Sequence, residues 1–129
     1  MKKTILIAMA TLTLLAGATA VSSQTRIRFA RGARHATVTG TLTSYKQERV
    51  YLIHVAAGQK MTVEDVGNHA VSIYIEGPRG SDYVQDLAAD CHGHTDIDST
   101  SAGDYKITVQ ECQKVDRWRG TFKFKVTVR

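Results

Sequence analysis

The chain has 129 residues, of which 17 are Lys or Arg and 12 are Asp or Glu, giving a formal net charge of +5. This length fits one domain with a single modest core and leaves no room for a second. The basic residues are scattered without an aromatic-interleaved stripe, which argues against a nucleic-acid partner. A local basic patch that faces an acidic protein partner is compatible with this composition.

The first 20 residues have the organisation of a secretory signal peptide. Lys2 and Lys3 form a charged head, an apolar run follows, and small residues lead to a cleavage site after Ala20. The run of about a dozen residues is shorter than the roughly 20 that a membrane-spanning helix needs. We therefore expect a cleaved leader at residues 1–20 and one domain at residues 21–129. The mature protein should lie in the periplasm or the medium, without a membrane anchor.

Two cysteines, Cys91 and Cys112, lie beyond the leader. In an oxidising compartment such a pair predicts a disulfide, which is favoured here over a catalytic thiol. In the chain-entropy view the crosslink contributes about 3 kcal/mol to the free energy of unfolding. That is a useful addition for so small a domain.

Most of the chain beyond the leader alternates apolar and polar residues with a period of two, which is typical of half-buried strands. Residues 26–31 and 37–43 show this pattern. Residues 49–55 are more apolar and predict a central strand. After a turn at residues 57–60, we expect residues 61–66 to return antiparallel.

The second half of the chain continues this pattern. A turn leads to a strand at residues 71–75, and residues 77–80 form a Gly-Pro loop. Residues 105–109 and 122–128 predict two further strands, the last with two Phe and two Val on one face and Lys and Thr on the other. Seven or eight short strands separated by regular turns indicate an antiparallel sandwich or barrel.

The segment 90–98 gathers two histidines and three aspartates, which are residue types that bind metals. Their spacing matches no zinc or calcium motif, so we expect a polar surface loop held by the disulfide. A metal site on His92 and His94 is the alternative. No serine lies in a strained Gly-x-Ser-x-Gly turn, and the acidic residues show no recognisable pairing. The sequence therefore predicts a protein that is not an enzyme and uses no cofactor.

Residues 114–119 join the last two predicted strands, and we interpret them as a hairpin loop. The loop carries three cations, Lys114, Arg117 and Arg119, and the only Trp of the chain, Trp118. Arg and Trp carry much of the binding energy at protein interfaces, and a planar guanidinium pairs bidentately with carboxylates. This loop is therefore a candidate recognition site. The alternative is a solubilising loop whose Trp folds over the edge of the fold.

A series of short motifs runs along nearly the whole chain beyond the leader. In chain order they are Ile27-x-Phe29-x-x-Gly32, Val38-Thr39-Gly40, Ser44-Tyr45, Ala57-Gly58-Gln59-Lys60-Met61-x-Val63, Tyr74-Ile75-x-Gly77-Pro78, His92-Gly93 and Ala102-Gly103-Asp104-Tyr105-x-Ile107-x-Val109. Collinear and with almost no insertions, they resemble the periplasmic inhibitors of g-type lysozyme. The Gly-Gln turn and the Gly-Asp-Tyr motif are also similar to prepeptidase-type β-sandwich accessory domains.

The resemblance implies an all-β fold, an antiparallel β-sandwich of about eight strands, whose loops at one end plug the cleft of a lysozyme. A family Tyr falls on Tyr45, and a family Arg falls on Arg117. A second family Arg falls near Gln113 or Lys114, where a lysine cannot make the bidentate contact. We expect Tyr45 and Arg117 to anchor the lysozyme. The supporting candidates are Asn68, His69, Lys114, Trp118 and Arg119.

The expected function is that of a periplasmic protein inhibitor of g-type lysozyme, which is therefore the expected partner. Lysozymes use ionised and protonated carboxyl groups in a groove. A cationic loop inserted there would pair with them and exclude sugar and water. The alternative function is a non-catalytic module that binds the cell wall or a carbohydrate with the same scaffold.

Overall fold

The computed structural model describes residues 24–88, 91–113 and 117–129, so the predicted leader lies outside the described residues. All the regular secondary structure in these ranges is β-strand. The strands are β1 (Thr25–Arg26), β2 (His35–Leu42), β3 (Glu48–Val55), β4 (Met61–Asp65), β5 (Val71–Glu76), β6 (His94–Ile97), β7 (Gly103–Glu111) and β8 (Gly120–Val128). These ranges contain no helix that is long and apolar enough to span a membrane.

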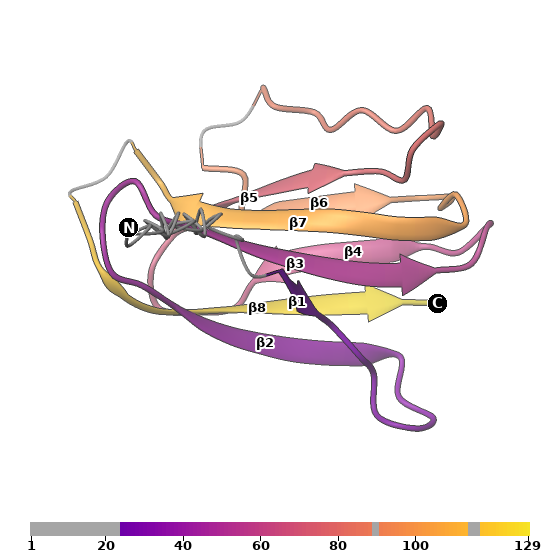
Figure 1. Cartoon of the computed structure of the whole chain (residues 1–129), viewed down its shortest axis with the longest axis horizontal. Coiled ribbons are helices and arrows are strands. Elements are labelled where there is room, and N and C mark those ends of the chain that lie inside the picture. The colour runs from indigo at the N-terminus through magenta and orange to yellow at the C-terminus, as the bar shows by residue number, and fades with distance from the viewer. Residues whose placement is uncertain (1–23, 89–90, 114–116) are drawn as a thin grey trace, which may run out of the picture.

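The strands form two four-stranded sheets that pack face to face (Figure 1). The β3 sheet has the order β1-β3-β7-β5, and the β8 sheet has the order β2-β8-β4-β6. Neighbouring strands are antiparallel except β1, which pairs in parallel with β3. The prediction of an all-β sandwich of about eight strands, most of them antiparallel, is confirmed.

Aromatic side chains from both sheets meet in the core. Phe122 and Phe124 of β8 are buried, and Tyr51 of β3 contacts them edge-on, with ring centroids 6.4 and 5.2 Å away. Gly40 lies opposite Phe122 in the β2·β8 ladder. A Cβ atom at Gly40 would overlap the Phe122 ring and the Tyr51 hydroxyl, so this position has room only for glycine. The predicted inward face of residues 122–128 is confirmed.

Two predicted strand pairings are wrong, because each pair is divided between the sheets. β3 pairs with β1 and β7, whereas β4 pairs with β6 and β8. β7 and β8 also lie in different sheets, so the segment between them connects the sheets and does not close a hairpin. A strand that faces its sequence neighbour across a core alternates with the same period as one that pairs with it. The pattern alone therefore cannot separate these cases.

The predicted strand at residues 26–31 is wrong beyond Arg26. Ile27 is still buried, and its N–H donates to the carbonyl oxygen of Leu52 at 2.8 Å, but no ladder continues from there. The prediction that residues 90–98 form a loop is also wrong in part, because β6 lies within them. β6 is a short edge strand with one buried residue, Ile97, which gave little alternation to detect.

The connections other than the one between β5 and β6 gather at two opposite ends of the sandwich (Figure 1). The Tyr45 end, on the left of Figure 1, comprises residues 43–47, 66–70, 112–113 and 117–119. The Arg129 end, on the right, comprises residues 27–34, 56–60, 98–102 and the terminal Arg129. Backbone hydrogen bonds join the turns of the Arg129 end, such as Thr100 N–H to Gln59 and Lys60 N–H to Arg129, both at 2.7 Å.

Candidate functional site

The connections at the Tyr45 end all pass from one sheet to the other. The β2–β3 and β4–β5 connections enter the β3 sheet, and the β7–β8 connection returns to the β8 sheet. They therefore span the edge of the core and extend beyond the strands (Figure 1). Side chains that are far apart in the sequence can meet on such an end.

Tyr45 and Arg117 are in direct contact. The guanidinium carbon of Arg117 lies 5.0 Å from the centroid of the Tyr45 ring, which is a cation–π geometry. Tyr45 is half-buried and Arg117 is exposed. The Tyr45 ring therefore restricts the long, flexible side chain of Arg117 and leaves the guanidinium group accessible to solvent. Such restraint lowers the entropy that a binding partner must remove.

A local hydrogen-bond network shapes the loop that carries Tyr45. The side-chain Oε1 atom of Gln47 accepts hydrogen bonds from the Thr43 backbone N–H and, at 2.8 Å, from the Thr43 hydroxyl. The Gln47 backbone N–H donates to the Ser44 carbonyl at 3.1 Å. These hydrogen bonds close the loop on itself and hold its backbone on both sides of Tyr45.

Trp118 is held between the core and the β4–β5 connection. Its ring stacks on His69 with centroids 4.6 Å apart and planes 23° apart, and it packs against the hydrophobic core. A Cβ atom at Gly120 would come within 2.9 Å of the Trp118 ring, so the glycine permits this close packing. Trp118 is half-buried, whereas His69 is exposed. Trp118 therefore supports the loops at this end, as well as offering one edge to solvent.

Asp65 shapes the turn that presents Asn68 and His69. One carboxylate oxygen accepts the Gly67 N–H at 2.9 Å, and the other accepts the Val71 N–H at 3.3 Å. Asparagine and aspartate commonly close turns in this way. Asn68 and His69 are exposed at the tip of the turn.

Glu111, at the end of β7, is a buried residue that the sequence analysis missed. Its side chain is 1% exposed, and its Oε1 atom accepts the backbone N–H of Trp118. No hydrogen-bond partner for its Oε2 atom is found among the described residues. Along β7, Glu111 lies on the same inward-facing side as the buried Tyr105, Ile107 and Val109. This alternation was the signal in the sequence that could have predicted its burial.

The predicted disulfide is confirmed, and it lies at the Tyr45 end. Cys91 and Cys112 are bonded, with Cα atoms 5.2 Å apart. Cys112 directly follows Glu111, and Cys91 precedes β6. The bond therefore ties the start of the β7–β8 connection to the edge of the β8 sheet.

The structure brings most of the sequence-predicted site residues to one end. A shallow hollow of about 280 Å³ is lined by residues 43–45 and 117–119. Arg117 and Arg119 are exposed there, and no carboxylate of the described residues pairs with either. Lys114 lies outside the described residues.

The two candidate metal-binding histidines have separate surroundings. His92 packs against Tyr74 at a centroid distance of 5.7 Å. His94 lies 3.0 Å from Asp96, whose carboxylate also accepts the Thr62 hydroxyl at 2.6 Å. The Thr62 hydrogen bond, followed by that of His94, lowers the pKa of Asp96. Within the described ranges, no three His, Cys, Asp or Glu side chains are arranged to hold a metal ion.

Solved structures with this fold include inhibitors of g-type lysozyme. The periplasmic g-type lysozyme inhibitor PliG of Aeromonas hydrophila has a TM-score of 0.65 and 20% identity, covering 83% of this chain and 96% of its own. PliG of Salmonella Typhimurium has a TM-score of 0.59 and 20% identity, covering 84% and 100%. The resemblance to these inhibitors is confirmed at the level of the fold.

The same scaffold serves another class of protein. The pre-peptidase C-terminal domain of a Bacillus anthracis collagenase has a TM-score of 0.53 and 16% identity, covering 86% of this chain and 99% of its own. No protein-family model and no curated protein sequence matches the chain. A shared scaffold does not imply a shared function, so function has to be argued from the site.

Proposed function

We propose that this protein is an exported inhibitor of g-type lysozyme that blocks the cleft of the enzyme with the Tyr45 end. The observation that carries the proposal is the contact between Arg117 and Tyr45, two residues 72 positions apart on separate loops. The inhibitor-like fold of the chain supports it. The partner is a lysozyme of the g type.

The proposed mechanism is occlusion without chemistry. Arg117 is a planar cation without a carboxylate partner among the described residues, so it is free to pair with the carboxyl groups of a lysozyme groove. Tyr45 restrains Arg117 and adds aromatic contact area. The supporting contacts come from Asn68, His69, Lys114, Trp118 and Arg119. Sugar and water are then excluded from the groove, and this chain supplies no catalytic group and no cofactor.

The proposed site of action is the periplasm, which the chain reaches through the leader at residues 1–20. N-terminal sequencing of protein recovered from the periplasm of an expressing strain tests this step. We expect the mature chain to begin at Val21. A chain that retains Met1, or that stays in the cytoplasm, contradicts it.

The experiment that tests the function is an inhibition assay. The protein recovered from the periplasm is titrated against g-type, c-type and i-type lysozymes, with cell-wall lysis as the readout. We expect stoichiometric loss of g-type activity and weaker effects on the other two. Full g-type activity at a large excess of this protein overturns the proposal.

The second candidate function is a cell-wall or carbohydrate-binding module. The shared fold with a pre-peptidase domain favours it, because that neighbour is the C-terminal domain of a collagenase. Co-sedimentation with purified peptidoglycan in the absence of lysozyme distinguishes the two. Retention on peptidoglycan together with no lysozyme inhibition supports the module.

A further inference from the structure

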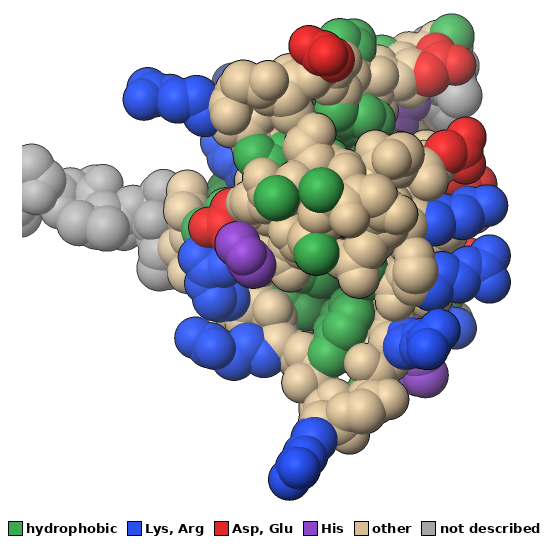
Figure 2. Space-filling model, turned by 90° about the vertical axis from the view of Figure 1, so that its right-hand side faces the viewer, with side chains coloured by type: hydrophobic (Ala, Val, Ile, Leu, Met, Phe, Trp, Pro, Cys, Tyr) green, Lys and Arg blue, Asp and Glu red, His purple; other side chains and the backbone are tan. Residues whose placement is uncertain are grey.

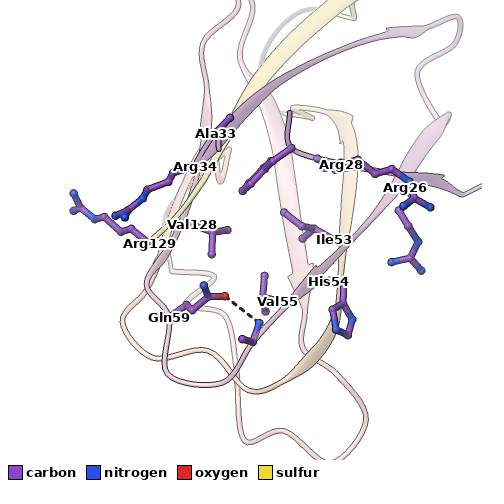
Figure 3. Close-up of a pocket in the computed structure, with 13 residues that line it drawn as sticks. Arg26, Arg28, Ala33, Arg34, Ile53, His54, Val55, Gln59, Val128 and Arg129 are labelled. Atoms are coloured by element: carbon purple, nitrogen blue, oxygen red, sulfur yellow. Dashed lines mark hydrogen bonds between the residues drawn. The ribbon is translucent and has the colours of Figure 1, made fainter. Parts of the chain in front are cut away.

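A larger hollow lies at the Arg129 end, which the proposed lysozyme contact does not use. It has a volume of about 620 Å³, within the range of roughly 300–1,000 Å³ that is typical of small-molecule sites. Ile53 and Val55 of β3 and Val128 of β8 point toward its middle (Figure 3). These three side chains are at most 8% exposed, so the hollow ends on the core of the sandwich.

Four arginines surround this apolar floor. Arg34 and Arg129 extend on one side of the hollow, and Arg26 and Arg28 extend on the other (Figure 3). Figure 2 shows the same end in space-filling form, with hydrophobic side chains at the bottom of the hollow and Lys and Arg side chains around it. No Asp or Glu lines the hollow.

The arginines of this rim differ in their partners. Arg26 donates to both carboxylate oxygens of Asp104, at 3.0 and 2.9 Å, and is therefore already paired. Arg28, Arg34 and Arg129 have no carboxylate side chain within 4.0 Å among the residues that the structure describes. Three guanidinium groups without a carboxylate side-chain partner among the described residues thus extend outward from the edges of the apolar floor, those of Arg34 and Arg129 on one side and that of Arg28 on the other (Figure 3).

Backbone hydrogen bonds hold two of these arginines in place. Arg129 is joined to Lys60 by two hydrogen bonds, of 2.7 and 3.0 Å. The carbonyl oxygen of Arg34 accepts the Val128 N–H at 2.8 Å. The backbone of Arg34 and Arg129 is therefore held by hydrogen bonds that continue the β8 sheet.

The combination of floor and rim selects one class of ligand. Exposed arginines that serve only solubility need no apolar hollow beside them, and a purely apolar ligand gains nothing from a rim of cations. We propose that the Arg129 end binds a small anionic amphiphile, with its apolar chain over Ile53, Val55 and Val128 and its acidic head among the rim arginines. A guanidinium group pairs well with either a carboxylate or a phosphate head.

The ligand class is tested on the protein purified from the periplasm, by calorimetric titration with decanoate below its micellar concentration. Burial of each methylene strengthens binding by about fourfold, so octanoate, which is two methylenes shorter, should bind about sixteenfold more weakly. Decyltrimethylammonium has the same chain and the opposite charge, and should bind at least tenfold more weakly than decanoate. Equal affinity for the anionic and cationic probes, or no binding of decanoate, overturns the proposal.

The location is tested by a pair of double variants with the same change in net charge. Arg28→Glu with Arg34→Glu reverses two exposed rim cations, and the control, Arg79→Glu with Lys123→Glu, reverses two exposed cations outside the hollow. We expect the rim variant to lose at least tenfold in decanoate affinity and the control to lose no more than twofold. Equal losses contradict the assignment to this hollow.

Two further measurements separate the hollow from a general anionic surface. Ala33 lines the hollow, and Ala33→Trp should fill it and abolish decanoate binding. Folding of each variant is checked by circular dichroism. If Ala33→Trp does not fold, the pair of charge-reversal variants still tests the location.

Co-sedimentation with phosphatidylglycerol vesicles distinguishes a membrane source of the acidic head. Binding to vesicles without binding of monomeric decanoate overturns the proposal in favour of a membrane surface.

Discussion

The two ends of the sandwich use arginine in different ways. At the Tyr45 end the guanidinium of Arg117 lies over an aromatic ring on a loop that extends beyond the strands. At the Arg129 end the arginines stand around a hollow that reaches the core. The first arrangement is suited to entering a groove, and the second is suited to receiving a ligand. Arginine therefore indicates a surface that inserts into a partner where its loop extends beyond the strands, and a site that receives a ligand where it borders a hollow.

The largest expected effect comes from the crosslink that only the Tyr45 end possesses. The disulfide joins residues 21 positions apart, and we expect Cys91→Ser with Cys112→Ser to lower the free energy of unfolding by about 3 kcal/mol. Urea denaturation of the variant and the parent measures this loss. Because the bond lies at the Tyr45 end, lysozyme inhibition should fall more than decanoate binding. An unchanged unfolding free energy would show that packing alone holds that end.

The next effect separates the functions of the two ends. Arg117→Ala should weaken lysozyme inhibition by about 2 kcal/mol, or roughly thirtyfold, because interface arginines are common hot spots. Decanoate binding should stay unchanged, since Arg117 lies at the other end. Arg79→Ala is the matched control, because Arg79 is exposed and lies outside the Tyr45 end. Equal inhibition constants for the parent and Arg117→Ala would place the anchor elsewhere.

A smaller effect tests whether Tyr45 restrains Arg117. Tyr45→Ala removes the ring below the guanidinium and should weaken inhibition by about 1 kcal/mol. Tyr45→Phe keeps the ring face and should retain most of the affinity. The two inhibition constants, measured side by side, decide between restraint by the ring and a contact made by the hydroxyl. A loss as large in Tyr45→Phe as in Tyr45→Ala would favour the hydroxyl.

Local patterns in the sequence predicted the elements better than their arrangement. The alternation at residues 122–128 predicted the buried face of β8, and the cysteine pair predicted the disulfide. The parallel pairing of β1 with β3 was not predicted, because alternation does not specify the direction of the neighbouring strand. The division of β7 and β8 between the sheets was missed for the same reason, since alternation does not specify which strand is the neighbour.

The composition of each end was still harder to predict. Arg129 is far in sequence from Arg26, Arg28 and Arg34, so along the chain these residues look like scattered positive charges. The pairing of β8 with β2 brings Arg129 close to Arg34, and the pairing of β1 with β3 in the other sheet places Arg26 and Arg28 across the hollow. The contact of Tyr45 with Arg117 likewise depends on long-range pairing. A family resemblance suggested both residues, whereas no spacing in the chain could place them together.

The smallest expected effect concerns the one rim arginine that is already paired. Hydrogen bonds from Arg26 and then from His54 lower the pKa of Asp104 to about 2, below the value of about 3.9 in an unfolded chain. A lowered carboxyl pKa stabilises the fold above the unfolded pKa, and this contribution is lost as the pH falls from about 4 toward 2. Urea denaturation at pH 5 and pH 2.5 should therefore show a larger loss of stability in the parent than in Asp104→Asn. The exposed Asp82→Asn is the control and should follow the parent. Identical pH profiles for Asp104→Asn and the parent would show that the pair contributes nothing to the fold, and that Arg26 is as free as the other rim arginines to meet an acidic head.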